Sequence, residues 1–154
     1  MTIGELNQRI KKYTSKRAIT HNLGTLLKGN PHLVMQYQME QLFRDSIGAD
    51  DWPLGFYSYN TARMSKHPGE KSGGTPFTMF ESGSFLSGMY IDISGRKNVT
   101  IEIGSKTPHL QEMLSNPAFE SNHFFGLTQT NYERLAAKLT QFSAEWIIEG
   151  ITKR

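Results

Sequence analysis

The stretch from Phe80 to Ile103 gives the strongest indication of secondary structure in this chain of 154 residues. Apolar and polar side chains alternate on both sides of residues 94–98, a segment that contains Gly95 and Asn98. Alternation with a period of two is typical of a strand with one buried face, and two such runs around a turn predict a β-hairpin. The side chains expected on the buried face are Met89, Ile91, Ile93, Val99, Ile101 and Ile103.

Helices are expected to cover this hairpin, because an isolated pair of strands is only marginally stable in water. Apolar residues at helical spacing predict helices at residues 31–47 and 131–149. Asn30 is the expected N-cap of the first of these helices, and Gly48 is its expected end. We therefore predict an α+β fold in one domain over residues 1–154, with a small antiparallel sheet packed by two or three helices and a long extended loop.

Two Thr-x-x-Glu sequences predict the starts of the first and last helices. In a capping box, the threonine side chain accepts a hydrogen bond from the backbone of the glutamate, and the glutamate side chain binds the backbone of the threonine. Thr2 and Glu5 have this spacing, and so do Thr130 and Glu133. One face of the first helix is basic, which indicates either a solvated surface or contact with an acidic partner or packaged DNA. Its basic residues are Arg9, Lys11, Lys12, Lys16 and Arg17.

The middle of the chain is expected to consist largely of loop. Short additional strands are predicted near residues 56–59 and 77–80, and residues 60–76 form a segment rich in glycine, proline and lysine. Long loops inside a domain are usually functional or become ordered on a partner. We expect residues 60–76 to reach a neighbouring subunit and to pair with the edge of its sheet, and a loop without a role is the alternative.

Three phenylalanines follow a short helix that is expected after Pro108. Phe119, Phe124 and Phe125 lie in a segment without helical or strand periodicity, and such large side chains require burial. We favour an interpretation in which they cover the core of their own chain. The alternative is that some insert into a neighbouring subunit.

Composition excludes several classes of protein. No apolar run is long enough to cross a membrane, and the N-terminal residues do not follow the pattern of a secretory signal, so synthesis in a cytoplasm is expected. The chain contains no cysteine, which excludes disulfides, thiolate-bound zinc and a cysteine nucleophile. A net charge of +3 is too small to indicate nucleic-acid binding by itself.

No common catalytic or metal-binding pattern is present in the sequence. Asp50-Asp51 is typical of a turn, and residues 69–74 lack the Gly-Lys-Ser/Thr ending of a phosphate-binding loop. We expect no enzymatic activity, no cofactor and no metal ion, and a small hydrolase that combines distant acids and histidines is a third class of function. The histidines follow none of the usual metal-ligand spacings, and they are His21, His32, His67, His109 and His123.

The residues just before the hairpin carry a resemblance to a known family. Ser82-Gly83-Ser84-Phe85 resembles the (Thr/Ser)-Gly-x-(Phe/Leu) signature that opens the sheet of tailed-phage tail-completion and head-to-tail joining proteins. The resemblance covers roughly residues 55–150 and includes the glycine-rich loop ahead of the motif and Phe125-Gly126-Leu127-Thr128 ahead of the last helix. It implies structural roles for Ser82, Gly83, Phe85 and Gly126.

This resemblance implies a non-enzymatic structural protein of the virion neck, made in the cytoplasm of the host bacterium. Such a protein assembles into a homo-oligomeric ring that joins the head or connector to the tail, so the implied partners are the portal or connector and tail proteins, and DNA in the channel is a further candidate. Residues 60–76 and the hairpin tip at 94–98 are the expected contacts between subunits. The candidate contact residues are Arg63, Lys66, Lys71, Arg96 and Lys97.

A nucleic-acid-binding module is the alternative function. The basic first helix would contact phosphate groups. The aromatic side chains of Phe56, Tyr57 and Tyr59 would stack on bases.

Overall fold

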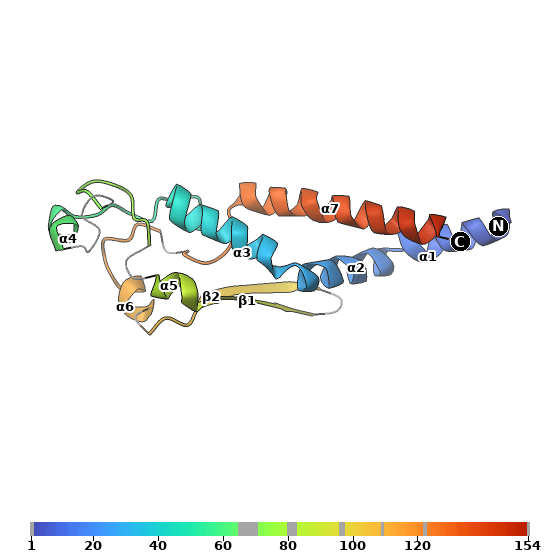
Figure 1. Ribbon diagram of the computed structural model, residues 1–154, viewed down its shortest axis with the longest axis horizontal. Helices are drawn as coiled ribbons and strands as arrows, with labels where there is room; N and C mark the ends of the chain where they lie inside the picture. Colours follow the sequence, from blue (N-terminus) through green and yellow to red (C-terminus); the bar gives the residue numbers. More distant parts are fainter. Residues whose placement is uncertain are drawn as a thin grey trace.

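The chain forms an elongated α+β structure, seen here in a computed structural model, with α1 at one end and α4 at the other (Figure 1). The structure describes residues 2–64, 71–79, 83–95, 98–108, 110–121 and 123–153. The helices are α1 (Ile3–Thr14), α2 (Lys16–Gly29), α3 (Pro31–Met39), the π-helix η1 (Glu40–Asp45), α4 (Tyr59–Met64), α5 (Ser84–Gly88), α6 (Leu110–Leu114) and α7 (Gln129–Thr152). The strands are β1 (Met89–Ser94) and β2 (Thr100–Ser105).

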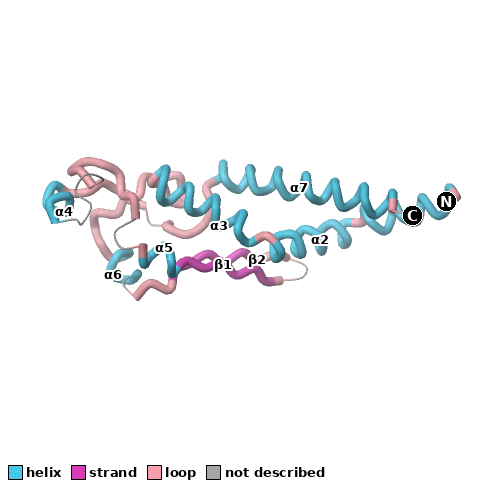
Figure 2. The backbone as a smooth tube through the Cα atoms, viewed as in Figure 1, coloured by secondary structure: helices cyan, strands magenta, loops and turns pink. Residues whose placement is uncertain are grey.

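The predicted hairpin is confirmed in its two antiparallel strands and in the side chains that share its inner face. β1 and β2 pair antiparallel, with Ile91 opposite Ile103 and Ile93 opposite Ile101 (Figure 2). These cross-strand isoleucine pairs lie on one face because side chains alternate along a strand. Together with Val99 they pack against the core cluster that contains residues of α2 and α3.

The helices and the hairpin form layers (Figure 1). α2 and α3 pack on β1, as expected for residues 31–47, whereas α7 packs on α1, α2 and α3. The C-terminal helix nevertheless contributes Leu135 and Leu139 to the cluster against which the hairpin isoleucines pack. Two strands about 4.8 Å apart form a sheet no wider than one helix, which is about 10 Å across, so α2 and α3 already fill the available width.

Two apolar clusters form the core. One joins Leu27 and Val34 to Leu135 and Leu139 of α7. The other contains Leu42, Leu54, Tyr57, Phe77, Met79, Phe85 and Phe124. Phe119 and Phe125 pack against this second cluster, which confirms that the phenylalanines of this segment cover the core of their own chain.

The central helix is irregular and ends earlier than predicted. The α-helix extends to Met39 and continues as the π-helix η1 to Asp45, and Ser46 then takes the left-handed conformation with φ 55°. The hydroxyl of Ser46 donates a hydrogen bond to the carbonyl of Phe77, which fixes the chain reversal two residues before Gly48. Gly48 is needed for a different reason, because a Cβ there would collide with Ser121 and with the backbone.

Two of the three predicted N-cap positions are confirmed and one is wrong. Thr2 and Glu5 form the predicted capping box at the start of α1. Asn30 occupies the predicted N-cap position of α3, directly before Pro31, but its side chain donates a hydrogen bond to the carbonyl of Leu26 and not to the start of α3. The N-cap of α7 is Thr128 rather than Thr130, because the buried backbone of Thr128 is held by a side chain from η1 and its hydroxyl accepts from Asn131.

The additional strands that we predicted do not form among the described residues. Residues 56–59 contribute only an isolated bridge, Phe56 to Pro76, and Tyr59 already begins α4. Residues 77–79 are not in a strand, and residue 80 lies outside the described part of the chain.

The segment 60–76 differs from the predicted structureless loop. Residues 60–64 belong to α4, and residues 65–70 lie outside the described residues. The later part pairs with its own chain, because Tyr57 donates to the carbonyl of Thr75 and Gly74 donates to the carbonyl of Tyr57, both at 2.9 Å. These backbone groups are therefore not free to pair with the sheet of a neighbour.

Within the ranges that the structure describes, no helix combines the length and the apolar composition that crossing a bilayer requires.

The burial of Leu42 leads to a testable prediction. Leu42→Ala removes a fully buried side chain from the second cluster and should lower the free energy of unfolding by about 2–5 kcal/mol. Leu114→Ala makes the same chemical change at a side chain that is 38% exposed and should cost less than about 1 kcal/mol. Urea unfolding followed by circular dichroism measures both values, and equal losses would contradict this assignment of the core.

Candidate functional site

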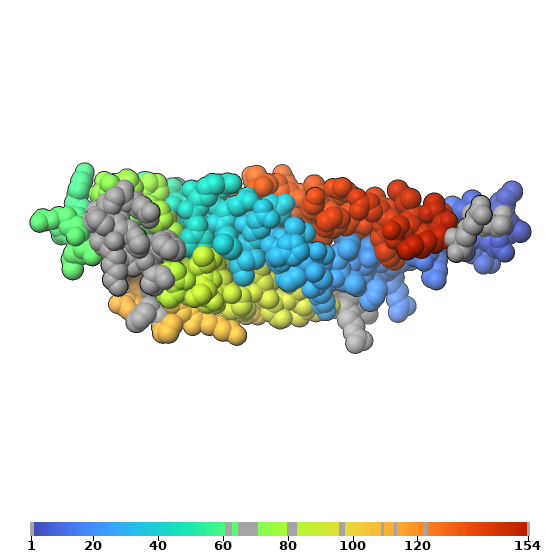
Figure 3. Space-filling model, in the orientation of Figure 1, coloured from blue at the N-terminus to red at the C-terminus, as the bar shows by residue number. Residues whose placement is uncertain are grey.

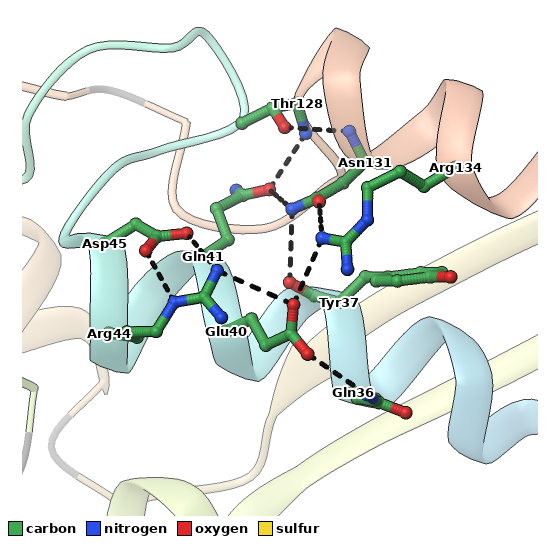
Figure 4. Close-up of polar contacts among 9 residues, drawn as sticks. All are labelled: Gln36, Tyr37, Glu40, Gln41, Arg44, Asp45, Thr128, Asn131 and Arg134. Atoms are coloured by element: carbon green, nitrogen blue, oxygen red, sulfur yellow. Dashed lines mark hydrogen bonds and ion pairs between the residues drawn. The ribbon is translucent and has the colours of Figure 1, made fainter.

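A network of polar side chains joins α3 and η1 to the start of α7 (Figure 4). The carboxylate of Glu40 accepts hydrogen bonds from Gln36 at 3.0 Å and from Arg134 at 3.1 Å. Arg134 also donates to the side-chain oxygen of Asn131 at 2.9 Å, and Arg44 approaches Glu40 at 3.7 Å. These contacts bring together helices that are about ninety residues apart in the chain.

Beneath this network, two fully buried glutamines bind the backbone of the segment that leads into α7. Gln38 donates to the carbonyl of Phe124 at 3.1 Å and accepts from the N–H of Gly126 at 3.0 Å. Gln41 donates to the carbonyl of Gly126 at 3.0 Å and accepts from the N–H of Thr128 at 2.9 Å. We call these four hydrogen bonds the amide clasp.

The π-helix begins at Glu40, between the two glutamines of the clasp. Asn131 completes the arrangement, because its side-chain amide donates to the carbonyl of Tyr37 at 3.3 Å and lies 3.4 Å from Gln41. Turns of π-helix commonly occur where particular side chains must be positioned. Here the π-helical turn lies where the central helix contacts both α7 and the segment of residues 124–128 that leads into α7.

Two carboxylates of the surface network have lowered pKa values. Hydrogen bonds from Gln36 and then Arg134 lower the pKa of Glu40, and the nearby charges of Arg134 and Arg44 act in the same direction. The hydrogen bond from Arg44 lowers the pKa of Asp45, and the same contact raises the pKa of Arg44. Both carboxylates are therefore ionised at neutral pH.

The side chains of this network are suited to a structural role, because they bind one another. Both carboxylates are engaged by arginine, and the nine residues drawn in Figure 4 include no imidazole or thiol. Among the residues that the structure describes, no group of three or more His, Asp or Glu side chains is placed to hold a metal ion. We interpret the network and the clasp as the attachment of α7 to the central helix.

The hairpin forms a second candidate site, because its sheet is incompletely covered. β1 and β2 make up a two-stranded sheet, so in the described structure each strand has a partner on one edge only. The side chains on its apolar face are only partly buried, although they point toward the helices, and they are Ile91, Ile93, Val99, Ile101 and Ile103. An unpaired strand edge is a ready template for another chain.

The surface of the whole molecule is large for its mass. The chain exposes 10268 Å² at 17.5 kDa. A compact monomer of this mass exposes about 7,900 Å² by the usual scaling of surface with mass. The excess, about 2,400 Å², is comparable with the surface buried in a stable interface between proteins.

Large apolar side chains are exposed on α1 and α4, which form the two ends of the elongated body (Figure 3), and on α7. Tyr59 and Met64 on α4 are 78% and 85% exposed, and Ile3 on α1 is 81% exposed. The complete set in the described residues is Ile3, Ile10, Trp52, Phe56, Tyr59, Met64, Leu114, Tyr132 and Ile148. Contacts with another protein would cover such side chains.

The predicted motif residues lie at the base of the hairpin and before α7. Gly83 precedes α5 with φ 75°, and Gly126 has φ 121°, both in the region that favours glycine. Phe85 is buried in the core, where its ring stacks on Phe125 with centroids 6.0 Å apart. Ser82 lies outside the described residues.

The candidate contact residues are not brought together as one surface. Arg63 is exposed on α4. Lys71 requires a correction, because it is 4% exposed and its ammonium lies 5.4 Å from the centroid of the Tyr57 ring, where a neighbouring subunit cannot reach it. Three further candidates lie outside the described residues, and they are Lys66, Arg96 and Lys97.

The two halves of the predicted nucleic-acid surface are separated. Tyr57 is buried, so it cannot stack on a base, while Phe56 and Tyr59 are exposed near α4. The basic residues belong to α1 and the start of α2, at the opposite end of the molecule (Figure 1). The structure therefore does not combine aromatic stacking with phosphate contacts in one groove.

The remaining polar candidates are dispersed or take part in turns. Asp50 accepts hydrogen bonds from Ser121 and from the backbone of Trp52, and Asp51 has φ 61°, as expected for a turn. Three histidines lie within the described residues, and all three are exposed at separate places: His21, His32 and His123. His67 and His109 lie outside the described residues.

Comparisons with protein families, with curated proteins and with solved structures found no match for this chain.

The sequence analysis did not identify the glutamines of the clasp. Gln38 and Gln41 lie four and seven residues after Val34, so all three fall on one helical face, and all three are fully buried. This spacing relative to an apolar residue was the one indication in the sequence that the two glutamines are buried. Glutamine is ordinarily exposed, and its burial depends on backbone groups of a segment more than eighty residues away.

The clasp predicts a large effect of a substitution that preserves shape. Gln41→Met keeps the length of the side chain but leaves buried backbone groups of Gly126 and Thr128 without partners, at about 1–3 kcal/mol each. The free energy of unfolding should fall by several times the effect of Gln129→Met, which is an exposed position. Denaturant unfolding measures both, and a Gln41→Met protein as stable as the control would contradict the role of the clasp.

The lowered pKa of Glu40 predicts a dependence of stability on pH. Charged Glu40 stabilises the fold above its ordinary pKa of about 4.3, and this contribution is lost as the pH falls through the lower pKa of the folded state. The stability advantage of the wild type over Glu40→Gln should therefore shrink as the pH falls from neutral into the acidic range below about 5. Thermal unfolding across this range measures it, with Glu133→Gln, whose carboxylate accepts from an amide, as control. A constant difference for Glu40→Gln would contradict the assignment.

Proposed function

We propose that this protein is a structural subunit of a tailed-phage neck that assembles into a ring between the head or connector and the tail. The observation that carries the proposal is the excess of exposed surface, about 2,400 Å² over a compact monomer of the same mass. The resemblance around Gly83 and Phe85 supplies the class of assembly. On this proposal the chain acts through its shape and catalyses no reaction.

The open hairpin supports a repeated contact between copies. Within the described ranges each strand pairs along one edge only, and the isoleucines on the inner face are incompletely covered. A contact between different surfaces of identical copies repeats from one copy to the next, and it closes into a ring when the rotation between copies divides a full turn. The elongated body presents different surfaces at its two ends, as such a head-to-tail contact requires (Figure 3).

Exposed apolar side chains support further contacts above and below the ring. Tyr59 and Met64 lie at the α4 end, far from α1, so one end of each subunit offers an apolar surface. On this proposal, that end binds a portal, connector or tail protein, because such side chains gain most from burial in an interface.

Self-association is the direct test of the proposal. Purified protein should form a discrete large species as its concentration rises, and negative-stain images of this species should show closed rings. Light scattering over a hundredfold range of concentration, repeated in a crowding polymer that favours association, measures the mass. A folded protein that stays monomeric under both conditions would contradict the proposal.

A further inference from the structure

The net positive charge of the chain is concentrated in its first thirty residues. Residues 2–30, which we call the basic arm, contain six Lys or Arg and one Glu, a net charge of +5. The other residues contain eleven Lys or Arg and thirteen Asp or Glu, a net charge of −2, and the two values sum to the +3 of the chain. The molecule is therefore electrically polar along its length, because the arm forms one end (Figure 1).

The cations of the arm have no anionic partner among the described residues. Lys11, Lys12, Lys16 and Arg17 are exposed, and none takes part in an ion pair with a described carboxylate. Cations this close together on one surface repel each other. An anionic surface supplied from outside the chain would remove that cost.

The arm is also only partly covered by its own chain. α1 contains no buried residue, and its contacts at the C-terminal end of α7 include Tyr13, whose ring meets Trp146 edge-on with centroids 5.0 Å apart, and Arg9, which donates to the carbonyl of Lys153. Gly150 permits this approach, because a Cβ there would collide with the ring of Tyr13. The other side of α1, including the exposed Ile3, remains open.

Among the described residues, the outer face of the hairpin carries two carboxylates, and one cation, Lys106, lies 5.4 Å from the centroid of the Tyr90 ring. Asp92 and Glu102 lie directly opposite each other across the strands, and both are exposed. Carboxylates in this position repel each other and destabilise the hairpin. Glu102 accepts a hydrogen bond from the hydroxyl of Tyr90 at 2.8 Å, but no described cation forms an ion pair with either carboxylate.

We propose that the basic arm of one copy docks on the Asp92–Glu102 face of the hairpin of the next copy. This inference rests on the proposed ring and identifies the surfaces that join its subunits. The contact cannot form within one chain, because the isoleucine face of the hairpin packs against α2 and α3 and the carboxylates therefore point away from the arm. Docking pairs the unmatched cations of one copy with the opposed carboxylates of the next.

A second copy explains more of the structure than DNA does. DNA would neutralise the cations of the arm but would be repelled by the hairpin, leaving the pair of Asp92 and Glu102 unexplained. Contact between copies accounts for both charged surfaces and for part of the excess exposed area. Complementary charge of this kind also orients the subunits and fixes the register of an interface.

Cross-linking between two different chains tests the contact directly. The natural sequence has no cysteine, so Lys12→Cys and Asp92→Cys each introduce a single thiol. When the two proteins are mixed and treated with a short bismaleimide, a mixed product should form in the assembled fraction. The control replaces Asp92→Cys by Lys138→Cys, on the exposed side of α7. Equal yields in the two mixtures would overturn the inference.

Charge reversal provides a second test, in which two defective variants should restore assembly when they are mixed. Lys11→Glu with Lys12→Glu and Lys16→Glu makes the arm acidic, and Asp92→Lys with Glu102→Lys makes the hairpin face basic. Each protein alone should assemble about tenfold or more weakly than the wild type. A mixture of the two should recover assembly, because each acidic arm then meets a basic hairpin and each basic arm meets an acidic one. Circular dichroism checks that these exposed substitutions leave the fold intact.

The outcomes separate this inference from the proposed ring. Wild-type rings that are unaffected by either reversal would overturn the docking contact and leave the neck function standing. A monomeric wild type with no selective cross-linking would overturn both. If reversal of the arm abolished retention of double-stranded DNA at physiological salt but left assembly unchanged, the arm would be a DNA contact and the inference would be wrong.

Discussion

The burial of two glutamine side chains is the constraint on which the rest of the structure depends. Burying a side-chain amide costs stability unless its donor and its acceptor both find hydrogen-bond partners. Gln38 and Gln41 meet this requirement with backbone groups of Phe124, Gly126 and Thr128. The chain between the phenylalanine-rich segment and α7 is thereby held in one conformation.

The position of the clasp also explains how two separate apolar clusters form one body. Gln38 lies between Val34, which belongs to the cluster with α7, and Leu42, which belongs to the cluster with the phenylalanines. The same hydrogen bonds fix Thr128 as the cap of α7. On the surface above the clasp, a guanidinium nitrogen of Arg134 lies 3.1 Å from a carboxylate oxygen of Glu40 and adds an ion pair between the two helices. Because surface ion pairs contribute little, we assign most of this stabilisation to the buried amides.

The hairpin contrasts with this well-satisfied region. In the part of the chain that the structure describes, its sheet has two strands with unpaired outer edges, a partly covered apolar face and two opposed carboxylates on the outside. Each of these features is unfavourable in an isolated molecule, and each would be relieved by contact with another chain. Features that lower the stability of an otherwise consistent fold are expected at the places where a protein makes its functional contacts.

The sequence by itself determined the elements whose signals are local. Alternation determined the hairpin and its inner face, and the spacing of Thr2 and Glu5 determined the start of α1, because strand periodicity and capping depend on neighbours within a few residues. The tertiary structure alone decided the position of α7 on α2 and α3, the cap at Thr128, the early end of the central helix at Ser46 and the burial of Lys71. Each of these depends on a partner distant in sequence, such as Gln41 for Thr128 or Phe77 for Ser46, and no local pattern specifies which distant group will meet it.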